Sequence, residues 1–483
     1  MGASNQKSEI SLLKLFVIFI VVYILLATLF FYLAGEQLHI RTSRGNQTML
    51  TPDSGTVELY EGTTVEQEFI TSIQRLEQID IQWGTYYRQN SGMVTIELYD
   101  ARNSSQISSR SFDVSELKEG GVTSIKFDTP LEGFSQIPLL IKIYSQNGQA
   151  GSSVSPLMNT QTTFEGSILK LNGNKVSGTL CFSAKGTDYI WTGLHYWSFV
   201  TLGFLLLVGA FVTVGWRYRN GKRSYIINAI VALRKYRFLI QQLVSRDFKT
   251  KYKRSVLGMF WSFLNPLLMM SVQYFVFSTI FKSDISNYAV YLLVGIVSFN
   301  FFSEACNMSL VSILGNASLI TKVYVPKYIY PLTRIMSSVV NLGISLLPLI
   351  IVCLTTGVQF HKSAILALYF LVCLIIFTLG LGLLLSSSMV FFRDTQFLWN
   401  VFSMVWMYAT PIFYPESILP DRFKFILNIN PLYYFLKNAR ICILDGISPE
   451  PVVYFQCMVI ALSMLLLGSL IFRKMQDRFV LYL

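Results

Sequence analysis

Long runs of apolar residues constrain the fold of this chain more than any other feature. Eight runs have about the length, near 20 residues, that a helix needs to cross the ~30 Å hydrocarbon core of a membrane. They are Leu15–Ala34, Tyr196–Trp216, Val256–Phe281, Tyr288–Leu314, Pro331–Thr356, Ser363–Phe392, Phe397–Phe413 and Val452–Phe472. Only 14% of the residues are charged, whereas a soluble chain carries about a quarter. The runs therefore predict a multi-span membrane protein.

The charges between these runs predict which segments stay in the cytoplasm. From Arg217 to Arg254 the chain has twelve basic residues and one acid, Asp247. Basic clusters beside membrane spans are retained in the cytoplasm. Residues 36–190 instead have 12 Lys and Arg against 17 Asp and Glu. We therefore expect residues 36–190 outside the cytoplasm and both termini inside, and we expect no nucleic-acid partner, since the basic cluster lies between membrane segments.

Residues 36–190 also differ in composition, being rich in Ser, Thr, Gly, Gln and Asn. Apolar and polar residues alternate in 93–99 and 139–144, a period-two pattern that predicts strands. Many short strands over such a length predict a β-sandwich. The chain thus divides into a cytoplasmic N-terminus with a first span (1–35), the sandwich (36–190), a second span (191–222), a cytoplasmic linker with an interface helix (223–255) and a six-span domain (256–483).

The linker ends in an amphipathic segment. Tyr236, Leu239, Ile240 and Leu243 fall on one helical face, and polar residues such as Lys249 fall on the other. A helix of this kind is expected to lie in the membrane interface rather than to cross the membrane.

The residues that characterise several functional classes are missing from this sequence. The six cysteines include no CxxC pair and no Cys/His cluster, so we expect neither a metal site nor disulfides. The phosphate-binding motif G-x-x-x-x-G-K-[ST] is missing, so this chain is not expected to hydrolyse ATP. We also find no paired acids of the D-x-D kind and no nucleophile–base constellation, which argues against an enzyme.

Five motifs in the last half of the chain occur in a defined order around the spans. They are Arg246–Gly258 followed by Trp261 and Pro266, then Lys322–Lys327, Phe392–Asp394, Thr410–Pro415 and Asn430–Leu432. Together they resemble the membrane subunits of polysaccharide ABC exporters, including those for O-antigen and teichoic acid. The resemblance covers residues from Tyr236 to the C-terminus. It implies a membrane all-α fold, a six-span ABC exporter permease core with an amphipathic interface helix. The two extra N-terminal spans and the extracytoplasmic all-β sandwich between them, expected from the residues themselves, are absent from the usual pattern of that family.

The resemblance also implies a function and a set of partners. The chain would be the transmembrane subunit of an ATP-driven exporter in the cytoplasmic membrane of a bacterium. Its expected partners are a second copy of itself, two copies of an ATP-binding ABC subunit, a polyprenyl-linked glycan and membrane lipid. No cofactor is expected in this chain, because ATP and magnesium would be bound by the partner subunit.

A permease driven by a separate ATPase needs rigid cytoplasmic contacts to receive its motion. The residues expected to provide this coupling are Arg246, Asp247, Lys249, Thr321, Lys322, Val323, Tyr324, Pro326, Lys327, Arg393 and Asp394. On charge alone, the loop that holds Lys322 and Lys327 is equally well an ordinary positive-inside loop. Arg393 and Asp394 are equally well a solvated pair.

Aromatic residues crowd the expected spans. The candidates for a sugar conduit are Trp261, Tyr274, Tyr291, Phe299, Phe302, Trp399, Trp406 and Tyr408, together with Glu304. Core packing and contact with lipid are expected to explain most of these aromatic residues. A carboxylate such as Glu304 inside a span needs a partner or a wet cavity, and Arg334 is the candidate partner.

Prolines at 411, 415, 420 and 431 break the chain at the end of the expected span Phe397–Phe413 and after it. The segment Phe413–Asn430 is too apolar for an exposed loop. We therefore expect short re-entrant helices there.

The motif Gly84–Gly92 with the strand that follows resembles a sandwich module of bacterial cell-surface polysaccharide proteins. Trp83, Tyr86 and Tyr87 are the candidate sugar contacts, and filling of the sandwich core is the equally weighted alternative. Two other functional classes stay open for the whole chain. One is a membrane-bound glycan polymerase or ligase, and the other is a surface glycan receptor with the sandwich as its sensor.

Overall fold

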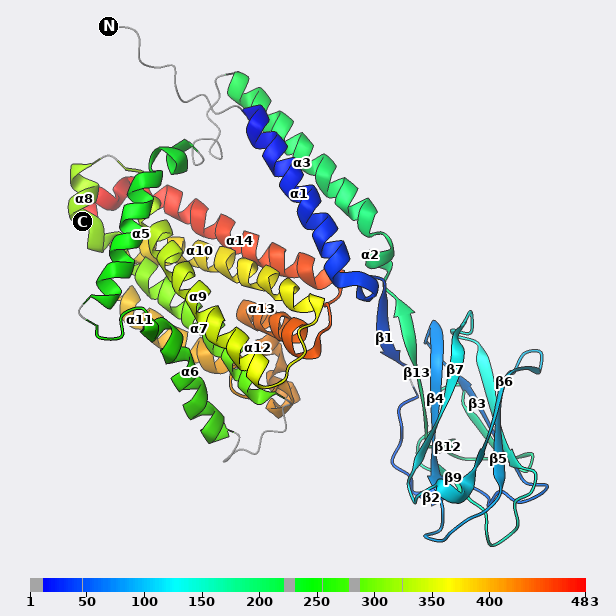
Figure 1. The fold of residues 1–483 in the computed structure, drawn as a ribbon. Helices are drawn as coiled ribbons and strands as arrows, with labels where there is room; N and C mark the ends of the chain where they lie inside the picture. Colours follow the sequence, from blue (N-terminus) through cyan, green and yellow to red (C-terminus); the bar gives the residue numbers. More distant parts are fainter. Residues whose placement is uncertain (1–11, 46, 221–230, 254, 278–286, 324) are drawn as a thin grey trace. The chain divides into compact units, whose positions relative to one another are not determined.

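The computed structural model describes residues 12–45, 47–220, 231–253, 255–277, 287–323 and 325–483. The chain forms two compact units. One unit is Met1–Leu38 with His195–Leu483, and its described part is helical; the other is His39–Leu194 and consists mainly of strands (Figure 1).

Thirteen strands lie in the described part of the strand unit. They are β1 (Ile40–Arg44), β2 (Ser54–Gly55), β3 (Thr64–Ile70), β4 (Arg75–Gly84), β5 (Met93–Asp100), β6 (Ser105–Asp113), β7 (Val122–Glu132), β8 (Pro138–Ser145), β9 (Ser155–Asn159), β10 (Ile168–Leu171), β11 (Asn174–Val176), β12 (Thr179–Leu180) and β13 (Phe182–Tyr189). A short helix, α2 (Trp191–Leu194), ends the unit.

These strands form two antiparallel sheets. The first has the order β1-β13-β4-β9-β12, with β7 on β4 and β2 on β9; the second has the order β11-β10-β3-β8-β5-β6. Buried and less buried residues alternate strictly along β8, so one face of that strand points into the core. Trp83, Phe69 and Phe182 lie in this core and are fully buried. The predicted all-β N-terminal domain is confirmed.

The described part of the helical unit contains long helices and shorter helical segments. The long helices are α1 (Leu12–Ala34), α3 (Tyr196–Arg219), α5 (Arg237–Tyr252), α6 (Phe260–Phe275), α7 (Tyr288–Leu310), α9 (Ile329–Thr355), α10 (Ala367–Phe391), α11 (Thr395–Ala409), α13 (Pro431–Arg440) and α14 (Pro451–Met475). Shorter helical segments are η1 (Gly35–Leu38), η4 (Leu314–Asn316), α8 (Ala317–Lys322), η5 (Lys362–Leu366), η6 (Glu416–Ile418), η7 (Asp421–Phe423), α12 (Lys424–Ile429), η8 (Ile441–Asp445), η9 (Gln476–Arg478) and α15 (Phe479–Tyr482).

Six described helical segments are long and apolar enough to cross a membrane. They are Phe16–Leu38, Tyr196–Arg217, Tyr288–Leu310, Ile329–Thr355, Lys362–Phe391 and Pro451–Tyr482. The other two expected spans are shorter helices, α6 with 16 residues and α11 with 15. Helix α11 measures only about 22 Å along its axis, and it ends where Thr410 precedes Pro411, a position that disfavours helical backbone. The end of the span expected at Val256–Phe281 lies outside the described residues.

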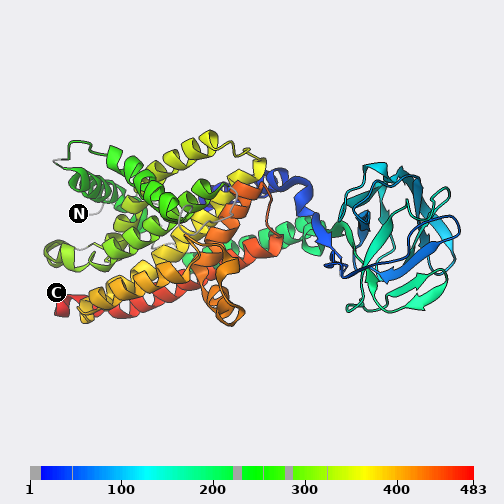
Figure 2. The same cartoon turned by 90° about the horizontal axis from the view of Figure 1, so that it is seen from below.

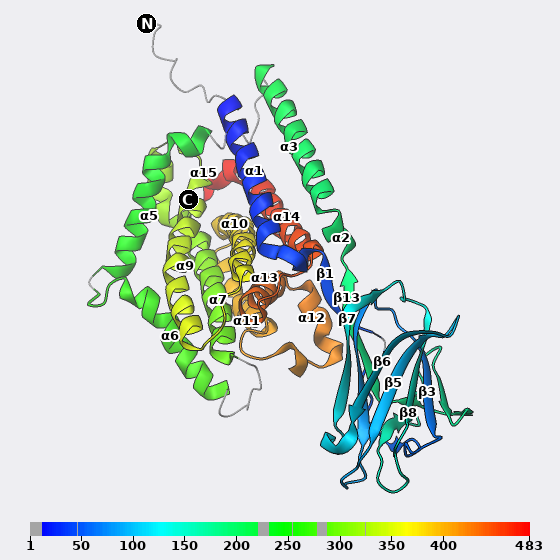
Figure 3. The same cartoon turned by 45° about the vertical axis from the view of Figure 1, so that its right-hand side comes forward.

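Helices α10 and α14 run side by side through the unit (Figures 1 and 2). Their backbones touch at Gly380 and Gly468, where a methyl group on either glycine would collide with the backbone of the opposite helix. Small residues permit such close approach between membrane helices. Helices α1 and α3 also lie side by side (Figure 3), and the Tyr23 hydroxyl of α1 donates to the Val200 carbonyl of α3 over 2.8 Å.

The segment that follows α11 breaks into η6, η7 and α12, as the prolines predict. Helix α13 then begins with Pro431 at its first turn, capped by the Asn430 side chain, which accepts from the Leu432 N–H. Its residues Phe435 and Leu436 are buried in the main core of the helical unit.

Candidate functional site

The predicted amphipathic helix is α5, and its apolar face is buried. Ile240 and Leu243 are 7% and 5% exposed, whereas Gln241 on the opposite face is exposed. Ile240 lies in one cluster with Val325 and Ile329. Helix α5 therefore packs against the segment that holds the predicted coupling loop.

Asp247 on α5 is a buried carboxylate whose contacts connect three elements. Its Oδ1 lies 3.0 Å from Nη1 of Arg334 in α9 and 3.1 Å from Nη2 of Arg246. The same Nη2 of Arg246 donates to Oδ1 of Asn316 in η4 over 3.4 Å. The side chain of Asp247 is only 2% exposed, and these two cations compensate its buried carboxylate. The network ties α5 to α9 and to the turn before α8.

A second ion pair lies one helical turn further along α5. Nζ of Lys251 is 2.9 Å from Oε1 of Glu304 in α7, and Nδ2 of Asn341 in α9 donates to the same oxygen over 2.7 Å. The predicted partner of Glu304 was Arg334, and that prediction is wrong, because Arg334 pairs with Asp247. The spacing of Asp247 and Lys251, four residues apart on a helix, was the signal that both point to one side.

The two networks face a cavity of about 580 Å³ between α5, α7 and α9. It is lined by Arg246, Asp247, Thr250, Lys251, Glu304, Met308, Gly315 and Arg334. Three cations and two carboxylates surround it, so its formal charge is +1. The expected coupling residues Arg246 and Asp247 thus belong to one polar site, while Lys249 is exposed on α5.

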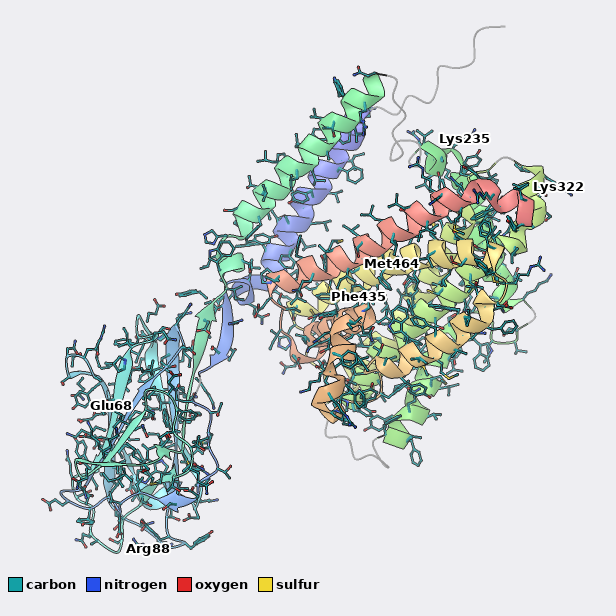
Figure 4. All side chains as sticks on the ribbon, turned by 180° about the vertical axis from the view of Figure 1, so that it is seen from behind. Glu68, Arg88, Lys235, Lys322, Phe435 and Met464 are labelled. Atoms are coloured by element: carbon teal, nitrogen blue, oxygen red, sulfur yellow. The ribbon has the colours of Figure 1, made fainter. Side chains whose placement is uncertain are left out.

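The predicted coupling loop begins at the end of α8. Thr321, Lys322 and Val323 are exposed, and Tyr324 lies outside the described residues. Figure 4 shows Lys322 at the same end of the helical unit as Lys235, which precedes α5. These side chains are accessible to a protein that approaches this end.

The far side of the loop is held by the C-terminal segment. Nζ of Lys327 donates to the backbone oxygen of Gln476 over 2.6 Å and lies 5.8 Å from the ring centre of Phe479. Phe479 is fully buried, so α15 is a fixed part of the unit. Pro326 lies between this anchor and the buried Val325, and the loop is attached to the unit on both sides.

Arg393 and Asp394 are both exposed in the turn between α10 and α11. Phe391 lies two residues before Arg393, and its ring centre is 5.9 Å from that of Phe479 and 4.8 Å from that of Tyr482. The turn therefore lies at the same end of the unit as the coupling loop.

The structure divides the aromatic candidates for a conduit into two groups. Phe299, Phe302, Trp399 and Trp406 pack together, with Phe302 at 5.1 Å from Trp406 and 6.1 Å from Trp399. Phe302 is fully buried and Trp399 is 4% exposed. These four rings fill the interior of the unit.

The other candidates lie at or near the surface. Trp261 and Tyr274 of α6 are 43% and 44% exposed, and Tyr408 of α11 is 60% exposed. Tyr291 is half-buried, and its hydroxyl donates to the carbonyls of Pro411 and Tyr414. The first three rings are available to contact lipid, substrate or a second protein chain.

Arg440 was not predicted from the sequence. It is buried in α13, donates to the carbonyls of Tyr291, Pro411 and Ile412, and stacks on the Tyr291 ring at 3.5 Å. Its neighbours Lys437 and Asn438 are also polar, so nothing in the local sequence marked it as buried. It closes one wall of a cavity of about 430 Å³ that also includes Glu416 and Lys437.

The aromatic candidates in the sandwich also separate. Trp83 is fully buried and lies 5.5 Å from the Phe112 ring in the core, so its assignment as a sugar contact is wrong. It occupies a β4 position that faces the opposite sheet. Tyr86 and Tyr87 are 47% and 91% exposed in the loop after β4.

The backbone of this loop is strained and held by one carboxylate. Tyr86 and Tyr87 both have φ of 55°, a left-handed conformation that costs a non-glycine residue about 1–3 kcal/mol. Glu119 accepts from the Thr85 N–H and hydroxyl over 2.7 and 2.9 Å and from the Tyr87 N–H over 3.4 Å. Burial raises the pKa of Glu119, but these hydrogen bonds outweigh burial and hold the pKa below its ordinary value.

Comparison with known proteins identifies the helical unit. Residues 238–444 match the family described as ABC-2 type transporter. An O-antigen export system permease protein of Klebsiella pneumoniae is 30% identical over 245 residues, which are 50% of this chain and 93% of that protein. Its counterpart in Myxococcus xanthus is 26% identical over 256 residues, or 53% and 98% of the two chains. A polysialic acid transport protein of Escherichia coli is 24% identical over 247 residues, or 49% and 93%.

The family match begins inside α5 and ends at the last turn before α14, so it includes both ion-pair networks and the coupling loop. The similarity to the Klebsiella protein covers 93% of that export permease, and three of the described helices that are long and apolar enough to cross a membrane lie within the family match. The chain belongs to the ABC-2 type transporter family, with a β-sandwich added before the permease domain.

Proposed function

We propose that this chain is the permease subunit of an ATP-driven exporter that moves lipid-linked polysaccharide out across the cytoplasmic membrane of a bacterium. The names of the relatives, O-antigen export permease and polysialic acid transport protein, support the substrate class. The observation that carries the coupling role is the attachment of α5 to α7 and α9 through Asp247 and Lys251. O-antigen, teichoic acid and related surface glycans are the candidate cargoes.

This attachment gives a physical route for motion. A force on α5 or on residues 321–323 is transmitted to the spans, since α5 is bound to α9 by a buried ion pair and to α7 by a second pair. Two ATP-binding subunits would supply this force, with ATP and magnesium bound in those subunits. Exposed Arg393 and Asp394 would add to the contact surface, because they lie at the same end of the unit.

The permease would act as a homodimer. The exposed rings of Trp261, Tyr274 and Tyr408 are then the candidate contacts for glycan between two copies, while the buried rings around Phe302 stabilise each copy. The polyprenyl anchor of the substrate would stay in contact with membrane lipid. The sandwich would lie outside the cytoplasm and handle the emerging glycan.

The coupling proposal is tested by placing charge on the exposed loop. Lys322→Glu and Val323→Asp should release the ATP-binding subunit from detergent-solubilised complexes and abolish polysaccharide export, while the permease itself still inserts and folds. Both positions are exposed, so the substitutions remove no buried contact. Co-purification of the ATPase and the amount of surface polysaccharide are the two readouts.

Lys175→Glu, an equally exposed charge reversal in the sandwich, is the matched control and should leave both readouts unchanged. Normal export by the loop variants would contradict the coupling role. Glycan polymerisation or ligation by the purified chain without any ATPase would favour the enzyme alternative. If deletion of the sandwich abolished a signalling response of the cell but left export intact, the alternative of a surface glycan receptor would be favoured.

A further inference from the structure

We propose that Tyr86 and Tyr87 form a binding site for uncharged sugar rings at one end of the sandwich. This proposal rests on the proposed export of polysaccharide and narrows the class of glycan that the sandwich recognises. It separates neutral polymers from phosphate-rich ones such as teichoic acids.

The strand register places the two tyrosines at the end of the sandwich opposite its chain connections. Ile40, the first residue of β1, pairs with Tyr189, the last residue of β13, so the chain enters and leaves at one end. Strand β4 starts near this end, where Arg75 pairs with Thr187, and finishes at the other end with Gly84. Figure 4 shows Arg88, in the loop after β4, at the tip of the strand unit.

Tyr87 is presented to solvent by a fixed backbone. Its side chain is 91% exposed, which leaves both ring faces open. The left-handed backbone at Tyr86 and Tyr87 is retained because Glu119 accepts from the Tyr87 N–H and from both donors of Thr85. The Tyr87 ring points away from the sandwich core, so the strained backbone that holds it there does not serve core packing. Strain of this kind concentrates where a side chain must be presented to a ligand.

Tyr86 provides a second, partly covered ring. The Arg88 guanidinium lies 4.8 Å from its centre and covers one face, and the side chain is 47% exposed. Arg88 is itself bound to the Glu58 carboxylate and donates to the Ser153 carbonyl over 3.1 Å. The cation beside the rings is therefore already neutralised.

This chemistry selects the ligand. Pyranose rings present C–H faces that pack on open aromatic rings, and their hydroxyls can bond to the surrounding carboxylates and amides. The loops at this end contain Glu58, Glu61, Glu116 and Glu119 against Arg88 and Lys118, a formal charge of −2. A phosphate or carboxylate polymer would be repelled, since Arg88 is already paired. An uncharged sugar meets no such barrier.

The test uses the full-length protein in nanodiscs. The probes are the uncharged and the anionic fractions of polysaccharide released from the surface of the expressing cells and separated by anion exchange. The uncharged fraction should bind the wild type. Tyr87→Phe should bind as the wild type does, whereas Tyr87→Gly should weaken binding by about tenfold, the loss expected when a stacked ring is removed.

Tyr87→Gly is the informative variant, because glycine adopts a φ of 55° without strain and the loop should fold at least as well as in the wild type. Tyr189→Ala removes a tyrosine that is 39% exposed at the opposite end and should leave affinity unchanged. Three results would each contradict the proposed site: binding by Tyr87→Gly as tight as that of the wild type, a preference of the wild type for the anionic fraction, or no binding by the wild type at millimolar sugar. Surface polysaccharide is measured in the same strains. Normal export by a chain that does not bind the sugar would contradict only the binding site. Normal export by cells that lack this chain would contradict the proposed function.

Discussion

The backbone N–H of Ser448 donates to Oε1 of Gln37 over 2.6 Å, which joins η1, at the end of the first span, to the segment before α14. The amide of the same glutamine donates to the Gly446 carbonyl over 3.4 Å. The next residue, Leu38, is 1% exposed and belongs to the main core of the helical unit. The first span is therefore an integral part of the permease fold in this chain.

We expect that shortening the side chains of Gln37 and Leu38 will destabilise the permease. Leu38→Ala should cost about 2–5 kcal/mol, because it leaves a cavity in a packed core. Gln37→Ala should cost about 1–3 kcal/mol, since it leaves the Ser448 N–H and the Gly446 carbonyl without their side-chain partner. Thermal unfolding of the purified protein in detergent measures both. Val17→Ala, at a residue of α1 that is 51% exposed, is the control, and a loss as large as that of Leu38→Ala would contradict the assignment.

The pair of Lys251 and Glu304 should couple energetically. Lys251→Met and Glu304→Gln should each lower stability, and the double variant should lose less than the sum, with an interaction of about 0.5–3 kcal/mol. The reason is that Glu304 also accepts from Asn341, so removing either charge disturbs a shared network. Additive effects in a double-mutant cycle would show that the two side chains do not interact.

The sequence predicted the parts of this fold whose signals are local. The alternation in 139–144 predicted strand β8, and the apolar face with Ile240 and Leu243 predicted the buried side of α5. Proline spacing likewise predicted the short helices after α11. In each case the pattern lies within a few residues, where periodicity and backbone chemistry decide the outcome.

Contacts between residues that are far apart in the chain could not be predicted from the sequence. Gln37 and Ser448 are 411 positions apart, and neither stands out in composition. The same reason explains the wrong partner for Glu304, since Arg334 and Lys251 are both cations and only the packing of α5 selects between them. Trp83 was misjudged because an aromatic residue next to a turn suits a core and a surface equally well, and the register of β4 decides the matter.

Topology is testable with engineered thiols, because all six native cysteines are buried. Ser109→Cys, on an exposed site of β6, should react with a membrane-impermeant maleimide in intact cells. Val323→Cys should react only after the membrane is opened. Cys181 should contribute little background, since burial and the nearby Asp53 carboxylate raise the pKa of its thiol to about 11. Labelling in the reverse order would place the sandwich in the cytoplasm.

The sandwich should lose stability in acid through Asp80. This carboxylate is 3% exposed on β4 and pairs with Lys185 at 2.5 Å, while the Ser124 hydroxyl donates to it over 2.6 Å. Burial raises its pKa, but these partners and Gln78 outweigh burial and hold the pKa below its ordinary value. The lowered pKa means that the stabilisation is present above the unfolded-state pKa, near ~3.9, and is lost as the pH falls through the folded-state pKa.

Denaturant unfolding of the fragment His39–Leu194 between pH 7 and pH 3 measures this effect. Asp80→Asn should lower the free energy of unfolding at neutral pH by about 1–3 kcal/mol, because the amide cannot replace the ion pair with Lys185. It should also flatten the decline between about pH 4 and pH 3, since the titrating group is gone. Asp128→Asn, at an exposed position of β7, is the matched control and should change stability by less than about 0.5 kcal/mol. An unchanged acid profile in Asp80→Asn would show that other carboxylates determine the acid sensitivity of the sandwich.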